Sequence, residues 1–345
     1  LLQIMLTIFF YCSFIYPQSF QNIFYPTKPI VDVFNVSATF RFIGPVDALF
    51  YNYLNRLSFE KELLQDTTLM QYDDFRSFDL KKHSKNIHII VMESFIDPTD
   101  FKNIKINKNI IPKKWVEYKN KNSFYGISPI TGGGSAQAEF EILCGAPSIR
   151  EFGTEFNILG NGKTNCLPSY LSKFGYKTIA SQPLFGSFFN IEKAYKSIGF
   201  NESFLRPSFD MSDMNNGWLS DESFFNQHFQ ILKNELINKK PILNYVFTVG
   251  CHSPLGQSKS LEVLIEYPQS KILEQFLNCH AKSIYHLNEY INKILNIDPD
   301  SLIIILPDHF PPGITISSYK DAGYICEKNQ QEFCDRRVRG IFIGN

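Results

Sequence analysis

The 345-residue sequence has no excess of charge of either sign, because Lys and Arg together number 34 and Asp and Glu also number 34. A general nucleic-acid binder needs a basic surface, so this balance argues against nucleic acid as a partner. The chain has no internal repeat, no low-complexity segment and no C-x-x-C pair, and the last absence argues against a zinc knuckle. Hydrophobic residues make up 44%, which predicts a substantial core rather than disorder.

Long apolar runs are also scarce, and the one at the start of the chain is short. Residues 1–16 (LLQIMLTIFFYCSFIY) carry no charge, but a bilayer span needs roughly 20 residues. Because the sequence does not begin with Met, we interpret this run as the end of a transmembrane helix, with a buried core helix as the alternative. A cleaved signal peptide is disfavoured, since no basic n-region or A-x-A-like site is present. Residues 17–85 then read as a juxtamembrane linker with short helices.

Cysteine is limited to seven residues, one of which, Cys12, lies in the apolar start. The other six suit disulfides in an oxidising compartment, and six reduced buried thiols in a cytosolic protein are the alternative. The membrane-like start favours export and therefore disulfides. Cys326 and Cys334 flank a short polar loop and form the pair that we expect most.

Five apolar runs predict the strands of a buried sheet. Helical patterns separate them, and the clearest of these covers 271–295, with apolar residues at spacings of three and four. This alternation predicts an α/β fold, a doubly wound and mostly parallel sheet with helices on both faces, for a catalytic domain over 86–345. The last run ends the sequence, which leaves room for further C-terminal elements. The five runs are 86–95, 176–182, 242–250, 301–309 and 339–345.

Polar residues end or closely follow four of these runs, at the point where each predicted strand ends. They are Glu93, Gln182, His252 and the pair Asp308 and His309. Ligands in open α/β sheets bind beyond the carboxyl ends of the strands, so we expect these side chains to converge. Each has an ordinary explanation alone, as a cap, a turn or a loop residue, but their joint occurrence favours a functional site.

The stretch SPITGGGSAQAEFEILCGAPS, residues 128–148, places three glycines directly before Ser135. Glycines permit a tight turn that would lift Ser135 to a helix start, where free N–H groups favour a developing anion. The alternative is a flexible loop with Ser135 as an ordinary helix N-cap. Carboxylates and imidazoles around a hydroxyl suit a Zn or Mn ion that produces an alkoxide near neutral pH. The predicted metal site consists of Glu93, Ser135, Asp308 and His309.

Four segments, VMESF, TGGGSAQAEFEILCG, FTVGCHSP and LPDHF, occur in an order that resembles a known family. It is the lipoteichoic acid synthase and membrane phosphoglycerol transferase branch of the alkaline phosphatase/sulfatase superfamily, and the resemblance covers about 86–345. It implies that Glu93, Asp308 and His309 bind a metal, usually manganese, with Zn²⁺ or Mg²⁺ as alternatives. It also implies that Ser135 is the nucleophile and that His252 contacts the substrate phosphoglycerol.

Three departures from the family pattern affect the head-group pocket. The best-known synthases use threonine where this chain has Ser135, and a histidine of the family is replaced by Gln182. The family's W-N-R run reads Phe189, Asn190, Ile191 here, so its arginine is missing. The candidate substrate-binding residues are His252, Gln182, Asn190 and Lys193, with Arg150 as a second cation.

A further segment, CGAPSIR at 144–150, is similar to the C-x-P-x-R motif whose cysteine becomes formylglycine in sulfatases. One extra residue precedes the proline and another follows it, so we reject a sulfatase activity on spacing.

The resulting expectation is a membrane-anchored, metal-dependent transferase with its catalytic domain outside the cytoplasmic membrane. It would move phosphoglycerol from a phospholipid to a cell-envelope glycan or polyol through a phospho-serine. The alternatives are a phosphoethanolamine transferase, a phosphodiesterase or phosphatase that uses water, and a non-catalytic glycan-binding paralogue.

Overall fold

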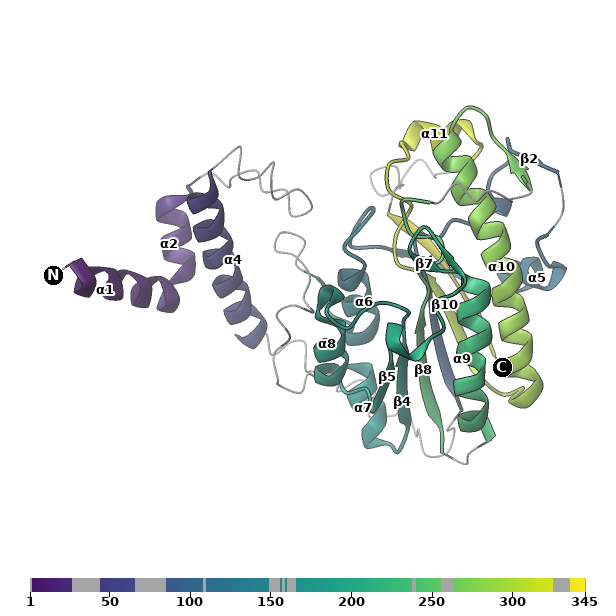
Figure 1. Cartoon of the computed structure of the whole chain (residues 1–345), viewed down its shortest axis with the longest axis horizontal. Coiled ribbons are helices and arrows are strands. Elements are labelled where there is room, and N and C mark those ends of the chain that lie inside the picture. Colours follow the sequence, from purple (N-terminus) through teal and green to yellow (C-terminus); the bar gives the residue numbers. More distant parts are fainter. Residues whose placement is uncertain are drawn as a thin grey trace.

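A seven-stranded sheet forms the centre of the protein, with strand order β3-β11-β10-β1-β8-β4-β5 (Figure 1). The helices that follow its strands cover both of its faces, so the predicted fold class is confirmed. The computed structural model describes residues 2–26, 44–65, 85–107, 110–148, 156, 159, 166–237, 240–255, 263–324 and 336–344.

Five neighbouring strands of this sheet are parallel, and four of them were predicted from the sequence. In register, Ile90 of β1 lies opposite Ile305 on one side and Val246 on the other. The carboxyl ends of these strands therefore meet at one edge of the sheet. In spatial order the strands are β10 (Leu302–Pro307), β1 (Ile87–Met92), β8 (Ile242–Phe247), β4 (Lys177–Ser181) and β5 (Glu202–Phe204).

The last two strands of the sheet run in the opposite direction. β11 (Arg337–Ile343) pairs antiparallel with β10, and β3 (Ser123–Ile127) pairs antiparallel with β11. The expectation of a parallel strand over 339–345 is therefore wrong in direction. An apolar run indicates burial, whereas direction depends on the connection. The described part of this connection contains only the short helix α11 (Ile316–Asp321), not a long crossover helix.

Each face of the sheet has its own apolar core. Alternate residues of β1 point to opposite sides, so Ile90 and Met92 join one core while Ile89 and Val91 join the other. The predicted helix at 271–295 is confirmed as α10, which packs with α9 on the first face. The first face carries α5 (Lys113–Asn122), α9 (Asp221–Ile237) and α10 (Lys271–Ile297). The second carries α6 (Ser135–Cys144), α7 (Leu167–Lys173) and α8 (Ile191–Ile198).

Short elements complete the loops around the sheet. Two small antiparallel pairs join β2 (Lys105–Ile106) with β9 (Ile265–Glu266) and β6 (Met214–Asn215) with β7 (Trp218–Leu219). Three single 3₁₀ turns, η3 (Pro98–Asp100), η5 (Phe188–Asn190) and η6 (Arg206–Ser208), follow β1, β4 and β5.

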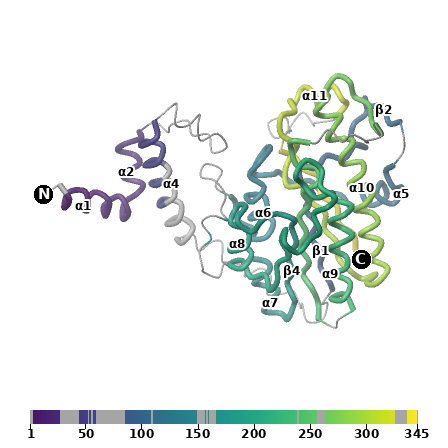
Figure 2. The backbone as a smooth tube through the Cα atoms, in the orientation of Figure 1, coloured from purple at the N-terminus to yellow at the C-terminus, as the bar shows by residue number. Residues whose placement is uncertain are grey.

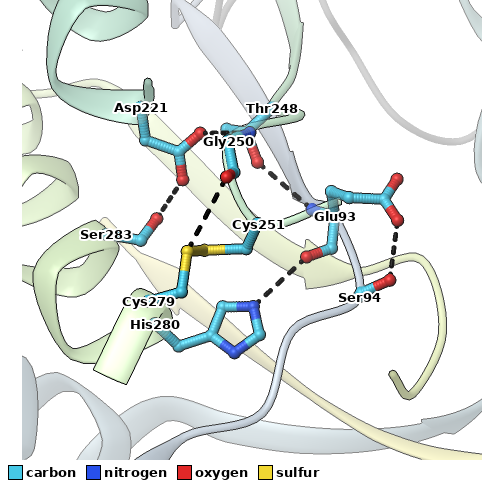
Figure 3. The surroundings of a disulfide bond; sticks show 9 residues. All are labelled: Glu93, Ser94, Asp221, Thr248, Gly250, Cys251, Cys279, His280 and Ser283. Carbon is cyan, nitrogen blue, oxygen red and sulfur yellow. Dashed lines mark hydrogen bonds between the residues drawn. A yellow bond between two sulfur atoms is a disulfide. The ribbon is translucent and has the colours of Figure 1, made fainter. Parts of the chain in front are cut away.

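Two disulfides join elements around the sheet. Cys144 at the end of α6 is bonded to Cys166 at the start of α7, and Cys251 after β8 is bonded to Cys279 in α10 (Figure 3). The expectation of oxidised cysteines is confirmed for these four residues. The pair that we expected most, Cys326 with Cys334, lies outside the described residues.

The N-terminal helices pack against one another and lie apart from the sheet (Figure 2). They are α1 (Leu2–Ile15), α2 (Pro17–Phe24) and α4 (Pro45–Gln65). Aromatic rings join them, with Phe9 of α1 5.3 Å from Phe20 and 5.7 Å from Phe50 between ring centroids. Among the residues that the structure describes, no helix combines the length and the apolar character that a membrane span requires.

Candidate active site

Three predicted metal ligands meet at the carboxyl edge of the sheet. Glu93 follows β1 directly, and Asp308 and His309 follow the neighbouring parallel strand β10. The register of the two strands brings these residues side by side. All three are buried, and one ligand atom from each lies within 4.8 Å of the others. They can hold one metal ion.

The three glycines before Ser135 form a turn that other residues would adopt with strain. Gly132, Gly133 and Gly134 have φ angles of 63°, 80° and 74°, in the left-handed region that favours glycine. A Cβ on Gly132 would lie 2.7 Å from the Cβ of Pro312, which belongs to the loop after His309. The turn therefore packs closely against the segment that carries two of the candidate ligands.

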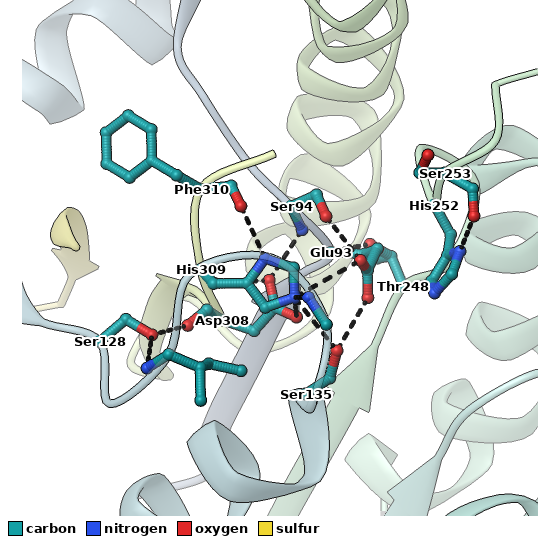
Figure 4. Close-up of polar contacts among 12 residues, drawn as sticks. Glu93, Ser94, Ser128, Ser135, Thr248, His252, Ser253, Asp308, His309 and Phe310 are labelled. Atoms are coloured by element: carbon teal, nitrogen blue, oxygen red, sulfur yellow. Dashed lines mark hydrogen bonds and ion pairs between the residues drawn. The ribbon is translucent and has the colours of Figure 1, made fainter. Parts of the chain in front are cut away.

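Ser135 is the first residue of α6, and Gly134 is its N-cap. The structure thus excludes the alternative that Ser135 is merely the cap. Its Oγ lies 3.4 Å from Glu93 Oε2 and 3.4 Å from His309 Nε2 (Figure 4). The hydroxyl joins the three candidate ligands at a helix N-terminus, where a developing alkoxide is stabilised.

The carboxylate of Asp308 has one oxygen paired and one directed into the cluster. Its Oδ1 accepts hydrogen bonds from the backbone N–H groups of Ser94 and His309, both at 2.7 Å. Its Oδ2 is buried without a hydrogen-bond partner among the described residues and lies 3.2 Å from His309 Nε2. A buried anionic oxygen without a partner is costly, and a cation would satisfy it. This oxygen is the best evidence that the site fits a metal.

The hydrogen-bond partners of His309 assign its tautomer. Its Nδ1 is 2.8 Å from the Phe310 carbonyl oxygen, so Nδ1 carries the proton that is donated. Nε2 then presents its lone pair towards Ser135 and also accepts from the Gly133 N–H at 3.2 Å. A fixed Nδ1–H with an unprotonated Nε2 that faces the cluster is the usual arrangement of a metal-binding imidazole.

Short polar side chains that the sequence did not single out support the cluster. Ser94 donates from Oγ to Glu93 Oε1 at 2.6 Å, and the Glu93 N–H donates to Thr248 Oγ1 at 3.2 Å. Ser128 donates from Oγ to the Asp308 carbonyl oxygen at 2.6 Å. Serine and threonine at loop positions give no distinctive sequence signal, except that Ser94 lies directly after Glu93.

Burial of the carboxylates and the repulsion between them favour a positive charge in the cluster. Burial and, after it, the negative charge of Glu93 raise the pKa of Asp308 to about 7. For His309, burial acts to lower the pKa, but the carboxylates of Asp308 and Glu93 outweigh it and the net direction is upward. Both shifts show that the pocket favours a cation or a retained proton.

His252 lies on the neighbouring loop after β8, across Thr248 from the cluster (Figure 4). Its ring packs on Trp218, with centroids 4.1 Å apart, and its Nδ1 is hydrogen-bonded to the Ser253 carbonyl oxygen. Burial lowers the pKa of His252, so the ring favours the neutral form. The sequence analysis did not identify Trp218, because a single aromatic residue before a helix gives no distinctive signal.

Gln182 lies in a buried polar network beside α6. Tyr195 donates to Gln182 Oε1 at 3.0 Å and is 2.7 Å from Glu139 Oε2, which also accepts from Tyr245 at 3.0 Å. Burial raises the pKa of Glu139 to about 8. Because Glu139 is one helical turn after Ser135, this network holds α6 against β4, β8 and α8.

The remaining candidates lie further along the chain. Asn190 is the N-cap of α8, and its side-chain amide donates to the Phe156 carbonyl oxygen at 2.8 Å. Lys193 is exposed on α8. Arg150 lies outside the described residues.

We call Glu93, Ser135, Asp308 and His309 the metal half of the site, and His252, Gln182, Asn190 and Lys193 the substrate half.

The disulfide between Cys144 and Cys166 also bears on the CGAPSIR segment. A cysteine whose sulfur is bonded to another cysteine is not available for conversion to formylglycine. The rejection of that motif on spacing is thus supported by the structure.

Sequence comparisons show which known proteins this chain is similar to. A family model described as Sulfatase matches residues 85–328. A lipoteichoic acid synthase from Staphylococcus saprophyticus is 26% identical over 245 residues, which cover 66% of this chain and 36% of that protein. The chain therefore spans about a third of the length of the curated relatives it matches.

Two solved structures are similar in fold. The lipoteichoic acid synthase LtaP from Listeria monocytogenes matches with a TM-score of 0.61 and 22% identity, covering 75% of this chain and 65% of that one. The Streptococcus pyogenes phosphoglycerol transferase GacH, solved with sn-glycerol-1-phosphate, matches with a TM-score of 0.60 and 16% identity, covering 85% and 74%.

Proposed function

The chain belongs to the sulfatase family, and we propose that it is a membrane-anchored, metal-dependent transferase of phosphoglycerol or a related phospho-head-group. The observation that carries the proposal is the position of the Ser135 hydroxyl, 3.4 Å from both Glu93 Oε2 and His309 Nε2 at the start of α6. The names of the relatives, lipoteichoic acid synthase and phosphoglycerol transferase, support this class of reaction.

In the proposed reaction, Ser135 Oγ attacks the phosphorus of a phospholipid such as phosphatidylglycerol. The bond from phosphorus to the diacylglycerol oxygen breaks, and diacylglycerol leaves with a proton. A hydroxyl of a glycan or polyol then attacks phospho-Ser135, and Ser135 regains its proton. His252, neutral because burial lowers its pKa, is suited to accept the proton of the acceptor hydroxyl.

Glu93, Asp308 and His309 would hold the metal, with Ser135 as the fourth ligand. The unpartnered Asp308 Oδ2 and the lone pair of His309 Nε2 fit such an ion. A divalent cation bound there supplies Lewis-acid stabilisation of negative charge on oxygen. We propose Mn²⁺, with Zn²⁺ or Mg²⁺ as the outcomes that metal analysis would distinguish.

The substrate half would bind the donor head group. His252 lies on the loop after β8, Asn190 lies in the segment between β4 and α8 and donates to the Phe156 carbonyl oxygen, and Gln182 accepts from Tyr195. Lys193 is the described candidate cation for the phosphate. The chain has Ile191 where the family's W-N-R run has arginine, so the resemblance does not define the head group.

The N-terminal helices support a place at the cytoplasmic membrane, with the catalytic domain on its outer side. On α1, large apolar side chains are at least 50% exposed, which suits contact with lipid. The two disulfides suit an oxidising compartment. The exposed residues are Ile4, Met5, Leu6, Ile8, Phe10, Tyr11 and Phe14.

The proposal is tested with vesicles that contain phosphatidylglycerol or phosphatidylethanolamine, labelled in the head group, together with Mn²⁺. We expect diacylglycerol release and label on an added glycan or polyol, and neither product from Ser135→Ala. Label released only as free head-group phosphate would establish a hydrolase instead. Diacylglycerol from neither lipid would contradict the proposal.

A further inference from the structure

The disulfide between Cys251 and Cys279 joins the loop after β8 to α10, close to Glu93 (Figure 3). Cys251 directly precedes His252 in the loop after β8, and Cys279 directly precedes His280 in α10. One covalent bond thus joins the backbone next to a candidate catalytic histidine to the long helix behind the sheet.

On the α10 side, His280 holds the end of β1. Its Nε2 lies 3.3 Å from the Glu93 carbonyl oxygen, and its buried ring packs on Phe95 with centroids 5.2 Å apart. The Glu93 N–H donates to Thr248, three residues before Cys251. Glu93 is therefore linked to the loop after β8 in two ways. One link runs through His280, α10 and the disulfide, and the other is the hydrogen bond to Thr248.

A buried carboxylate, Asp221 at the start of α9, bridges the same two segments. Its Oδ1 accepts from the Gly250 N–H at 3.0 Å, and its Oδ2 accepts from the hydroxyl of Ser283, one helical turn after Cys279. A Cβ on Gly250 would lie 2.6 Å from Asp221 Oδ1, so glycine permits this close approach. Trp218, three residues before Asp221, packs on the His252 ring.

From these contacts we infer that the Cys251–Cys279 disulfide, together with Asp221, fixes the position of His252 relative to Glu93. The bond and the carboxylate restrain residues 248–252 from α10 and α9. This role rests on the proposed function, because His252 acts there in transfer to the acceptor. The other disulfide joins the end of α6 to the start of α7. Cys144 lies at the far end of α6 from Ser135, about 13 Å away along the helix.

The test compares the full chain, loaded with Mn²⁺, with Cys251→Ser/Cys279→Ser and with the matched pair Cys144→Ser/Cys166→Ser. We expect the first variant to lower kcat of transfer at least about tenfold, because small misplacements of catalytic groups have large kinetic effects. Its affinity for Mn²⁺ should stay unchanged, and the matched pair should retain kcat within about twofold.

A positioning role is separated from a structural one by repeating both changes in a His252→Ala background. If the disulfide acts through His252, its removal there should lower the residual kcat less than about twofold. Ser283→Ala removes a hydrogen bond to Asp221 and leaves the disulfide in place. It should also lower kcat in the wild type but not in His252→Ala, and it replaces the cysteine variant if that variant does not fold.

Three results would overturn the inference. The first is that removing the Cys251–Cys279 disulfide lowers kcat equally in the wild type and in His252→Ala. The second is a loss of Mn²⁺ affinity that accounts for the lower kcat. The third is that removing either disulfide lowers kcat equally. Absence of transfer by the wild-type chain, in contrast, would reject the proposed function itself.

Discussion

The metal half and the substrate half of the site differ in where their polar atoms point. In the metal half, Ser135 and His309 converge on Glu93, and one oxygen of Asp308 has no partner among the described residues. In the substrate half, Gln182 accepts from Tyr195 and Asn190 donates to a backbone carbonyl. The polar atoms of the metal half thus converge on one another, whereas those of the substrate half are bonded to the surrounding fold.

This difference has a structural cause. The metal half is held by the ends of adjacent parallel strands and by a helix start, so the sheet itself sets its geometry. The substrate half depends on loops and on α8, which differ more readily between relatives. Relatives should therefore share the reaction of the metal half more widely than they share the choice of head group.

The largest expected effect is on the metal half. Asp308→Asn removes the charge of the unpartnered oxygen, and we expect Mn²⁺ affinity to fall by at least about 10²-fold, with loss of transfer. Asp298→Asn is a matched control, because Asp298 bonds Asn86 and Ser301 at the opposite end of the strands. Isothermal titration with Mn²⁺ checks this, and full affinity in Asp308→Asn would show that the ion binds elsewhere.

A smaller effect, confined to kinetics, is expected in the substrate half. His252→Gln should lower kcat about 10²-fold while Mn²⁺ affinity stays unchanged, because the ring is proposed to move a proton and not to bind the metal. Steady-state transfer assays beside metal titration measure both quantities. If His252→Gln loses the metal, the separation into two halves does not hold.

Glu139 connects the halves, and its pKa predicts how stability depends on pH. Burial raises that pKa from 4.5 to about 8, so the folded state keeps a proton that the unfolded chain releases. The stability this gives is fully present below pH 4.5 and is lost as pH rises towards 8. Glu139→Gln cannot ionise and keeps an acceptor for Tyr195 and Tyr245.

Relative to the wild type, Glu139→Gln should therefore gain about 2 kcal/mol in free energy of unfolding between pH 5 and pH 7. Urea unfolding at both pH values measures this. An equal difference between the two proteins at both values would mean that Glu139 is ionised throughout.

The smallest effect is expected for the exposed cation. Lys193→Ala should raise KM for phosphatidylglycerol about threefold and leave kcat unchanged, since an exposed charge contributes little to binding. Lys196→Ala, on the same helix, is the control. Competition between phosphatidylglycerol and phosphatidylethanolamine completes the comparison: a strong preference for phosphatidylglycerol that survives Lys193→Ala would place the head-group site elsewhere.

Sequence patterns were sufficient for the features that the sheet determines. Apolar runs located four parallel strands, and the polar residues after them located Glu93, Asp308 and His309 together. The run of glycines placed Ser135 at a helix start, because few other sequences tolerate three left-handed residues in succession.

Features that depend on tertiary contacts were not predictable. The partners of Cys251 and Cys144 are distant in sequence, and spacing alone does not select them. The exposed edge strand β3 lacks an apolar pattern. Glu139 resembled an ordinary helical carboxylate, and only packing against Tyr195 and Tyr245 reveals its burial.

The account depends most on Ser135 as a nucleophile whose reactivity requires the metal half. Intact-mass analysis of the chain after brief incubation with phosphatidylglycerol vesicles and Mn²⁺, followed by peptide mapping, tests this directly. The account predicts a phosphoglycerol adduct on Ser135 that is absent from Ser135→Ala and from chelated protein. An adduct on another residue would contradict the account. Transfer by Ser135→Ala without any covalent adduct would contradict it as well.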